Sequence, residues 1–443
     1  GQFNGSILVA EKGKVILSNG YGLANMEWNI GNTPATKFRI GSLTKQFTSM
    51  LIMQLVQENK IKLDAKMTDY LPEYRKDTGD KITIHHLLTH TSGIPSYTSL
   101  PSFFSDVSRI YYSVDDFTKE YCSGDLQFEP GSTFRYNNSG YFLLGNVIEK
   151  VTGKSYEQVL QERIFKPLGM ANSGYDTSKP IIKNRASGYE QTLDGYTNAA
   201  FLDMSLPFAA GSLYSTVEDL LLWDRALYTE QLLNNKNKAK MFTPFLKNYA
   251  YGWGTSEITI NEDKDKIGSV GHSGGINGFH ALITRLTKDQ HVIIQLNNTG
   301  GTSLGEMRNQ ITKILYGESF AAPKKSIAKA LYKTIKNNGI SSIGNTYQHL
   351  KQSAKEDYNF AERELNSLGY NLLQGKQIKE SVAVMKLNVE AYPKSANAHD
   401  SLGEVYLAND QKQQSLASYE MSLSLDPDNK NAKEVIEQLK SEL

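Results

Sequence analysis

Two kinds of hydrophobic pattern divide the first three quarters of the chain, and their order limits the folds open to it. Residues 5–10 and 14–18 have the pattern of two strands joined by a short turn, and strand patterns return at 266–272, 278–285 and 291–297. The residues between these two groups carry apolar positions mostly at helical spacing. Strands at both ends of a helical middle predict an antiparallel sheet in which the terminal segments meet, an α+β fold.

The composition changes after Gly317. Residues 318–343 include lysine-rich sequence from Pro323 to Asn338 and are predicted to form a helical linker, whereas residues 344–443 have the pattern of paired helices. We therefore expect an α+β domain over residues 1–317, the linker, and an all-α domain.

An internal repeat of 34 residues marks the all-α part. A leucine–glycine pair, a proline and an alanine recur at this spacing, as Leu368-Gly369 and Leu402-Gly403, Pro393 and Pro427, and Ala398 and Ala432. A period of this length, with a proline after the second helix, resembles the tetratricopeptide repeat. The resemblance implies a segment that binds a protein or peptide partner or that supports the neighbouring domain.

Ser42 and Lys45 form the first candidate for catalysis. They precede the helical pattern of residues 46–56, so Ser42 is expected at or near a helix start. Residues three apart share a helix face, which brings the lysine amine over the serine hydroxyl. A serine needs an adjacent base to act as a nucleophile, and a half-buried lysine can be that base. The N–H groups of the first helical turn favour a developing oxyanion.

The Ser-x-x-Lys pattern carries little weight alone, because a chain of this length contains it about once or twice by chance. The pattern does recur at Ser326 and Lys329, without a partner motif nearby. For Ser42 taken alone, a helix cap beside a solvated lysine is the simpler explanation.

Two further motifs accompany this pair. Tyr136 and Asn138 stand two residues apart after a predicted turn, and a phenol in a cationic pocket can lose or relay a proton near neutral pH. His272 ends a strand-like run and is followed by Gly274 and Gly275, which allow a substrate backbone to lie along the strand edge. Taken alone, each motif is also explained by a tyrosine or histidine that only packs.

Together and in this order, the three motifs resemble those of the penicillin-recognising serine hydrolases. That family includes class C β-lactamases, serine D,D-peptidases, D-aminopeptidases and β-lactamase-like esterases. The resemblance spans about residues 3–316 and extends to Leu-Leu-Thr-His-Thr-Ser-Gly at 87–93 and Gly-Ser-Leu-Tyr-Ser-Thr at 211–216. It implies a β-lactamase-like antiparallel sheet flanked by helices, with a helical subdomain.

The resemblance also implies a role for each motif residue. Ser42 would accept the acyl group, and Lys45 would activate it. Tyr136 would take the serine proton and pass it to the leaving group. The reaction would be a two-step acyl transfer through a covalent acyl-enzyme, with no metal and no organic cofactor.

The remaining motif residues would bind the substrate. Asn138 would orient Lys45 and the substrate amide, and His272 would bind or polarise the substrate. Gly274 and Gly275 would line the strand edge, with the N–H groups of Ser42 and Gly275 as the oxyanion hole.

The histidine in the third motif indicates which substrates are favoured. β-Lactamases of this branch usually have a lysine there, whereas a histidine is mostly neutral at pH 7 and grips a carboxylate less firmly. We therefore expect D,D-peptidase, D-amino-acid amidase or esterase activity ahead of β-lactamase activity. An alternative of another class is a catalytically silent binding protein whose helical repeats recruit a partner.

The composition argues against nucleic-acid-binding, membrane-spanning, disulfide-containing and metal-binding proteins. A net charge of +1 gives no reason to expect nucleic acid as partner, and no apolar run is long enough to cross a bilayer. The single cysteine excludes an intrachain disulfide, and His85, His86 and His90 lack a carboxylate at ligand spacing, so we expect structural histidines and no metal site. The family suggests an exported, periplasmic or secreted protein, although this sequence shows no signal peptide.

Overall fold

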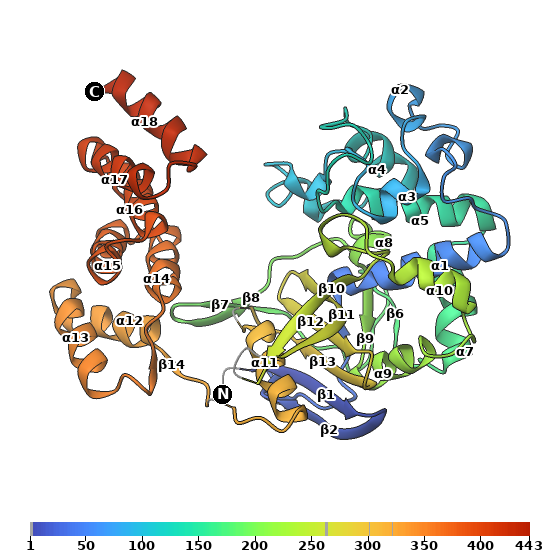
Figure 1. Cartoon of the computed structure of the whole chain (residues 1–443), viewed down its shortest axis with the longest axis horizontal. Coiled ribbons are helices and arrows are strands. Elements are labelled where there is room, and N and C mark those ends of the chain that lie inside the picture. The colour runs from blue at the N-terminus through green and yellow to red at the C-terminus, as the bar shows by residue number, and fades with distance from the viewer. Residues whose placement is uncertain (1–2, 262–264, 301, 321) are drawn as a thin grey trace. The chain divides into compact units, whose positions relative to one another are not determined.

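Figure 1 shows the computed structural model, which describes residues 3–261, 265–300, 302–320 and 322–443. The chain forms two compact units. The first unit covers Gly1–Gln191 and Tyr196–Phe320, and the second covers Thr192–Gly195 and Ala321–Leu443. Residue 321, within the expected linker, lies outside the described residues.

A six-stranded antiparallel sheet runs through the first unit, in the order β10-β11-β12-β13-β1-β2 (Figure 1). The first strand pairs with the last, because Gly5 lies opposite Asn297 and Ala10 lies opposite Val292. The meeting of the terminal segments that the sequence predicts is therefore confirmed. The strands are β1 (Gly5–Glu11), β2 (Lys14–Tyr21), β10 (Gly254–Ile260), β11 (Asp265–Ile276), β12 (Phe279–Leu286) and β13 (His291–Asn297).

Helices cover both faces of this sheet. On one face, Ile7, Val9 and Ile293 pack against apolar side chains of α11 (Leu304–Leu315). On the other face, Leu8 belongs to the main hydrophobic core, which also contains buried residues of α1 (Thr44–Gln57) and α9 (Val217–Ala226). This two-sided burial explains why β1 and β13 read as continuous apolar runs.

The edge strand β10 was absent from the sequence prediction, which placed the first strand of this region at residue 266. Ile258 and Ile260 are the only large apolar residues of β10, and both are buried, whereas Ser256 and Glu257 are exposed. Two apolar positions give too weak an alternation to identify a strand from sequence.

The remaining helices of the first unit lie largely in a region beside the sheet (Figure 1). They are α2 (Lys76–Gly79), α3 (Ile84–Leu88), α4 (Val114–Tyr121), α5 (Asn138–Thr152), α6 (Tyr156–Leu160), α7 (Lys166–Leu168), α8 (Phe208–Gly211) and α10 (Asn235–Phe242). Short strands β3 (Leu23–Asn25) to β9 (Leu213–Ser215) form small sheets between them. The α+β fold of the first unit thus agrees with the prediction.

The second unit is a run of helices, as predicted for the C-terminal part. Its helices are α12 (Ile327–Asn338), α13 (Ile343–Ser353), α14 (Glu362–Gln374), α15 (Ile378–Ala391), α16 (Ala396–Ala408), α17 (Lys412–Leu425) and α18 (Lys430–Glu442). In the stretch expected to be a linker, Ile327 and Leu331 of α12 are buried in one core with Leu365 and Leu368. Nowhere in the parts of the chain that the structure describes is a helix both long and apolar enough to cross a membrane.

Candidate active site

Ser42 lies in a single 3₁₀ turn, Gly41–Leu43, that leads directly into α1. The turn packs against strand β11 through two glycines. Gly41 has a φ of +51°, and a Cβ atom there would lie 2.8 Å from the carbonyl oxygen of Gly275. Only a glycine allows both this backbone conformation and this close approach. The backbone of Ser42 is thereby fixed beside the strand that carries the third motif.

We predict that Gly41→Ala destabilises the first unit more than an ordinary glycine replacement. The left-handed backbone costs about 1–2 kcal/mol for an alanine, and the clash with Gly275 adds to it, for a total of about 2–4 kcal/mol. Gly153→Ala is the matched control, because Gly153 has a φ of +66° but nothing within 4 Å of its Cβ position. Urea unfolding of both variants measures the difference, and equal losses would contradict the packing described here.

Lys45 is the second residue of α1 and is fully buried, at 0% exposure. Its Nζ atom lies 3.0 Å from Ser42 Oγ, 2.8 Å from Asn138 Oδ1 and 2.8 Å from the carbonyl oxygen of Ala210. Burial lowers the pKa of Lys45 well below its usual value. The structure therefore brings Ser42, Lys45 and Asn138 together, as the sequence predicts.

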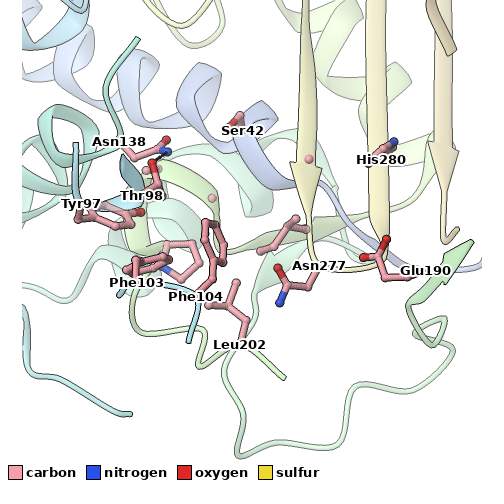
Figure 2. Close-up of a pocket in the computed structure, with 15 residues that line it drawn as sticks. Ser42, Tyr97, Thr98, Phe103, Phe104, Asn138, Glu190, Leu202, Asn277 and His280 are labelled. Carbon is pink, nitrogen blue, oxygen red and sulfur yellow. Dashed lines mark hydrogen bonds between the residues drawn. The ribbon is translucent and has the colours of Figure 1, made fainter. Parts of the chain in front are cut away.

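Asn138 begins α5 and is held at both ends of its amide. Its Oδ1 accepts a hydrogen bond from Lys45, and its Nδ2 donates to Thr98 Oγ1 at 3.0 Å (Figure 2). The backbone N–H of Asn138 donates to Ser96 Oγ at 3.2 Å. These bonds orient the amide so that its oxygen, and not its nitrogen, points at the lysine.

Tyr136 forms a wall beside the amine. The Lys45 Nζ atom lies 4.9 Å from the centre of its ring. Although 38% of the residue is exposed, desolvation by the surrounding protein raises the pKa of Tyr136, and its interaction with the Ser42 side chain only partly offsets this. The sequence argument expected a phenol that loses its proton readily, whereas this environment keeps the phenol protonated.

His272 lies on β11 and is neutral in this environment. Burial, followed by the nearby charge of Lys45, lowers its pKa to about 4. Its Nδ1 atom contacts the carbonyl oxygen of Ser273, and its Nε2 atom lies 2.9 Å from the hydroxyl of Tyr249. Since a carbonyl only accepts, Nδ1 carries the proton and Nε2 accepts from Tyr249.

We predict that Tyr249→Phe raises the pKa of His272 by about one pH unit. The tyrosine hydroxyl stabilises the neutral ring, and one such hydrogen bond is worth about 1 kcal/mol. An NMR titration of the His272 ring resonances checks this, with wild type expected to titrate near 4. A wild-type pKa near 6.5, or an unchanged value in the variant, would contradict the assignment.

The other histidines of this region have protein partners. His85 Nδ1 lies 2.8 Å from the hydroxyl of Tyr251, and His86 Nδ1 accepts from the backbone of Thr83 at 3.2 Å. His90 is 1% exposed, and its Nδ1 accepts from the Asn137 N–H at 3.0 Å. In the described parts of the chain, no group of three histidine, cysteine or carboxylate side chains could hold a metal ion.

His90 also packs against the aromatic residues of the site. Its ring centre lies 4.3 Å from that of Tyr136 and 4.6 Å from that of Tyr249. The His90 ring therefore supports the Tyr136 phenol by close ring packing.

A cavity of about 330 Å³ opens beside Ser42 (Figure 2). Ser42, Asn138 and Gly275 line it, whereas Gly274 does not. A Cβ atom on Gly274 would lie 2.0 Å from the carbonyl oxygen of Ile40, so this glycine allows strand β11 to approach the turn before Ser42. Gly274 therefore packs against Ile40 and does not form part of the cavity wall.

The two ends of the cavity differ in chemistry. Tyr97, Phe103 and Phe104 gather on one side of the view, and Glu190 and His280 lie on the other (Figure 2). The site therefore offers an aromatic surface and a polar surface on either side of the serine.

The second Ser-x-x-Lys sequence has a different environment. Ser326 is the N-cap of α12, where its side chain accepts from the Lys329 N–H and donates to Glu364. This serine satisfies the helix end and meets no lysine amine.

The sequence argument missed several residues of this site. Thr98 and Glu190 stand in no motif, so nothing in the sequence singled them out. Tyr249 stands two residues before Tyr251-Gly252, and its position next to that aromatic–glycine run was the one available signal.

Comparisons with known proteins identify the family of this chain. A family model for beta-lactamases matches residues 3–315. Penicillin-binding protein 4* of Bacillus subtilis is 29% identical over 367 residues, which cover 75% of this chain and 78% of that protein.

Solved structures show the same similarity. A penicillin-binding protein from Bacillus halodurans matches with a TM-score of 0.60 and 27% identity, over 68% of this chain and 92% of that one. D-amino acid amidase from Ochrobactrum anthropi matches with a TM-score of 0.57 and 27% identity, over 67% and 86% of the two chains. Because the family model covers more than half of its residues, this chain belongs to the beta-lactamase family and is a serine hydrolase.

Proposed function

We propose that Ser42 is the nucleophile of a two-step acyl transfer to water and that Lys45 is its general base. The observation that carries this proposal is the buried Lys45 amine, 3.0 Å from Ser42 Oγ with a lowered pKa. A neutral amine donates two hydrogen bonds and accepts one. Donation to Asn138 and Ala210 leaves its lone pair facing the serine hydroxyl.

In the first step, the Ser42 proton passes to Lys45 Nζ while Oγ bonds to the substrate carbonyl carbon. The carbonyl oxygen becomes an oxyanion, for which the N–H groups of Ser42 and Gly275 are the proposed donors. Both residues line the cavity, and Gly41 packs on the backbone of Gly275. When the intermediate collapses, the bond to the leaving group breaks and water later hydrolyses the ester on Ser42.

Tyr136 is the proposed acid for the leaving group. Its pKa is raised while that of Lys45 is lowered, so the phenol holds a proton when the amine is free to accept one. This division of roles differs from the expectation that Tyr136 itself takes the serine proton. In deacylation, the Tyr136 phenolate takes a proton from the attacking water, and Lys45 returns its proton to Ser42 Oγ, 3.0 Å away, which restores both groups.

The proposed substrates are amides or esters of D-amino acids or D,D-peptides, ahead of β-lactams. His272 is neutral at pH 7, since its pKa is about 4, and it offers no charge for the carboxylate of a β-lactam. It is the proposed contact for a neutral polar group of the substrate. The similar Ochrobactrum anthropi structure is a D-amino acid amidase, which favours amides.

Three chromogenic substrates test this ranking: a D-phenylalanine p-nitroanilide, the corresponding nitrophenyl ester, and a chromogenic cephalosporin. We expect turnover of the first two and, from the cephalosporin, an acyl-enzyme that lasts for hours. Rapid turnover of the cephalosporin with no amide or ester hydrolysis would support β-lactamase activity in its place.

A catalytically silent binding protein is less consistent with the site. Such a protein would have a filled pocket or a lysine turned away from the serine. Here the cavity reaches Ser42, and Lys45 points at its hydroxyl.

We also propose that the second unit is tetratricopeptide-like, a segment that would bind a protein or peptide partner or support the neighbouring domain. Helices α14 and α16 begin 34 residues apart, as do α15 and α17. The same hydrogen bond recurs at this spacing, from Ser381 to the Gly369 carbonyl and from Ser415 to the Gly403 carbonyl, each at 2.7 Å.

A location outside the cytoplasm is proposed from the penicillin-binding relatives, and fractionation of the native host tests it.

A further inference from the structure

We propose that Glu190 makes this site selective for acyl donors that carry a positive charge, and that it disfavours acyl groups that carry a carboxylate. This inference rests on the proposed acyl transfer at Ser42 and names the class of substrate. The expected substrate combines a cationic group with an apolar side chain.

The charged residues at the cavity surface favour a cationic ligand. Among the described residues that line the cavity, Glu190 is the only carboxylate, and none is a lysine or an arginine. The buried Lys45 amine is enclosed by Ser42, Asn138 and Ala210 and does not line the cavity. A cation entering the cavity therefore meets an opposite charge, whereas an anion meets a like charge and no surface cation.

Glu190 is held in place at the cavity. It lies on β7 (Tyr189–Thr192), and its Oε1 accepts a hydrogen bond from the Gly278 N–H at 2.7 Å. Gly278 follows β11, the strand that carries His272 and Gly275. Within the described chain, no lysine or arginine is seen to pair with this carboxylate, so its charge is available to a ligand. An anchored, unpaired carboxylate loses little side-chain freedom when it binds a cation.

The aromatic side of the cavity favours the same substrates. Tyr97 and Phe103 are buried, and Phe104 is 57% exposed at the cavity. Aromatic faces attract organic cations, quaternary ammonium groups above all, and they also cover apolar side chains. An acyl group with a benzyl side chain and an ammonium can use both surfaces.

The test uses three p-nitroanilides with the same benzyl side chain. The α-substituent is trimethylammonium, its uncharged isostere tert-butyl, or carboxylate. All three compounds are compared at one pH, and the quaternary ammonium keeps its charge at any pH. We expect kcat/KM to be about tenfold higher for the cation than for the isostere, and about tenfold lower for the anion.

Glu190→Gln removes the charge and keeps an oxygen for the Gly278 N–H. We expect the three kcat/KM values to converge to within about threefold. Glu73→Gln, at an exposed carboxylate that does not line the cavity, should preserve the full discrimination. In 1 M NaCl the discrimination of wild type should shrink, because the Debye length falls to about 3 Å.

Equal kcat/KM values in wild type, or unchanged discrimination in Glu190→Gln, would overturn the inference while leaving acyl transfer intact. If no compound is hydrolysed, the proposed function fails separately. Calorimetric binding of the same compounds to Ser42→Ala then decides the inference, since the order of affinities must follow charge and must vanish in the double variant with Glu190→Gln.

Discussion

Ser42→Ala is expected to lower kcat for a nitrophenyl ester or nitroanilide by about 10⁴-fold or more. Removal of the nucleophile in serine hydrolases costs this much, and the residual rate comes from binding and the oxyanion donors. The substitution removes one hydroxyl beside Lys45 and leaves the bonds of that amine to Asn138 and Ala210. The fold should therefore persist, and near-UV circular dichroism checks it.

The chain supplies its own control for this variant. Ser326→Ala alters the serine of the second Ser-x-x-Lys sequence, which caps a helix and contacts no lysine amine. It should leave kcat unchanged and cost at most about 1 kcal/mol of local stability. Equal activity in Ser42→Ala and wild type would exclude Ser42 as the nucleophile.

Lys45→Met is expected to lower kcat/KM by about 10²–10⁴-fold, the usual contribution of a positioned general base. Methionine roughly preserves the length of the side chain but removes the amine that meets Ser42 Oγ. Asn138 Oδ1 and the Ala210 carbonyl also lose a donor, which costs stability. Lys45→Arg separates the two effects, because arginine restores a donor yet cannot give up its proton near neutral pH.

The pH dependence of kcat/KM distinguishes a base from a fixed cation. The neutral form of Lys45 accepts the serine proton, so the rate should rise with pH through the lowered pKa of this lysine and then level off. Lys45→Met should lack this rise. A rate that falls over the same range in wild type would mean that protonated Lys45 is the active form.

The sheet and the three motifs could be predicted from sequence for a physical reason. Strands β1 and β13 are buried on both faces, so their apolar runs are continuous and easily recognised. The spacing of Ser42 and Lys45 follows from helix geometry alone. The apolar pattern of the edge strand β10 is short, so this strand could not be predicted from sequence.

The protonation states could not be predicted, because they depend on burial. The motif suggested an acidic phenol at Tyr136, but the surrounding protein raises its pKa and lowers that of Lys45. Likewise, Gly274 was expected in the substrate site, and its position against Ile40 became visible only in three dimensions.

The polar residues that complete the site come from distant segments. Thr98, Tyr249 and Glu190 reach it from loops and short elements outside every recognisable motif. Their contribution depends on which loops the fold brings together, and a single sequence does not contain that information.

Intact-mass analysis after exposure to a fluorophosphonate tests most directly the claim that a lysine-activated Ser42 attacks acyl groups. We predict one adduct per chain, located at Ser42 by peptide mapping, absent from Ser42→Ala and formed much more slowly in Lys45→Met. An adduct at another residue, or equal labelling of wild type and Ser42→Ala, would contradict the account.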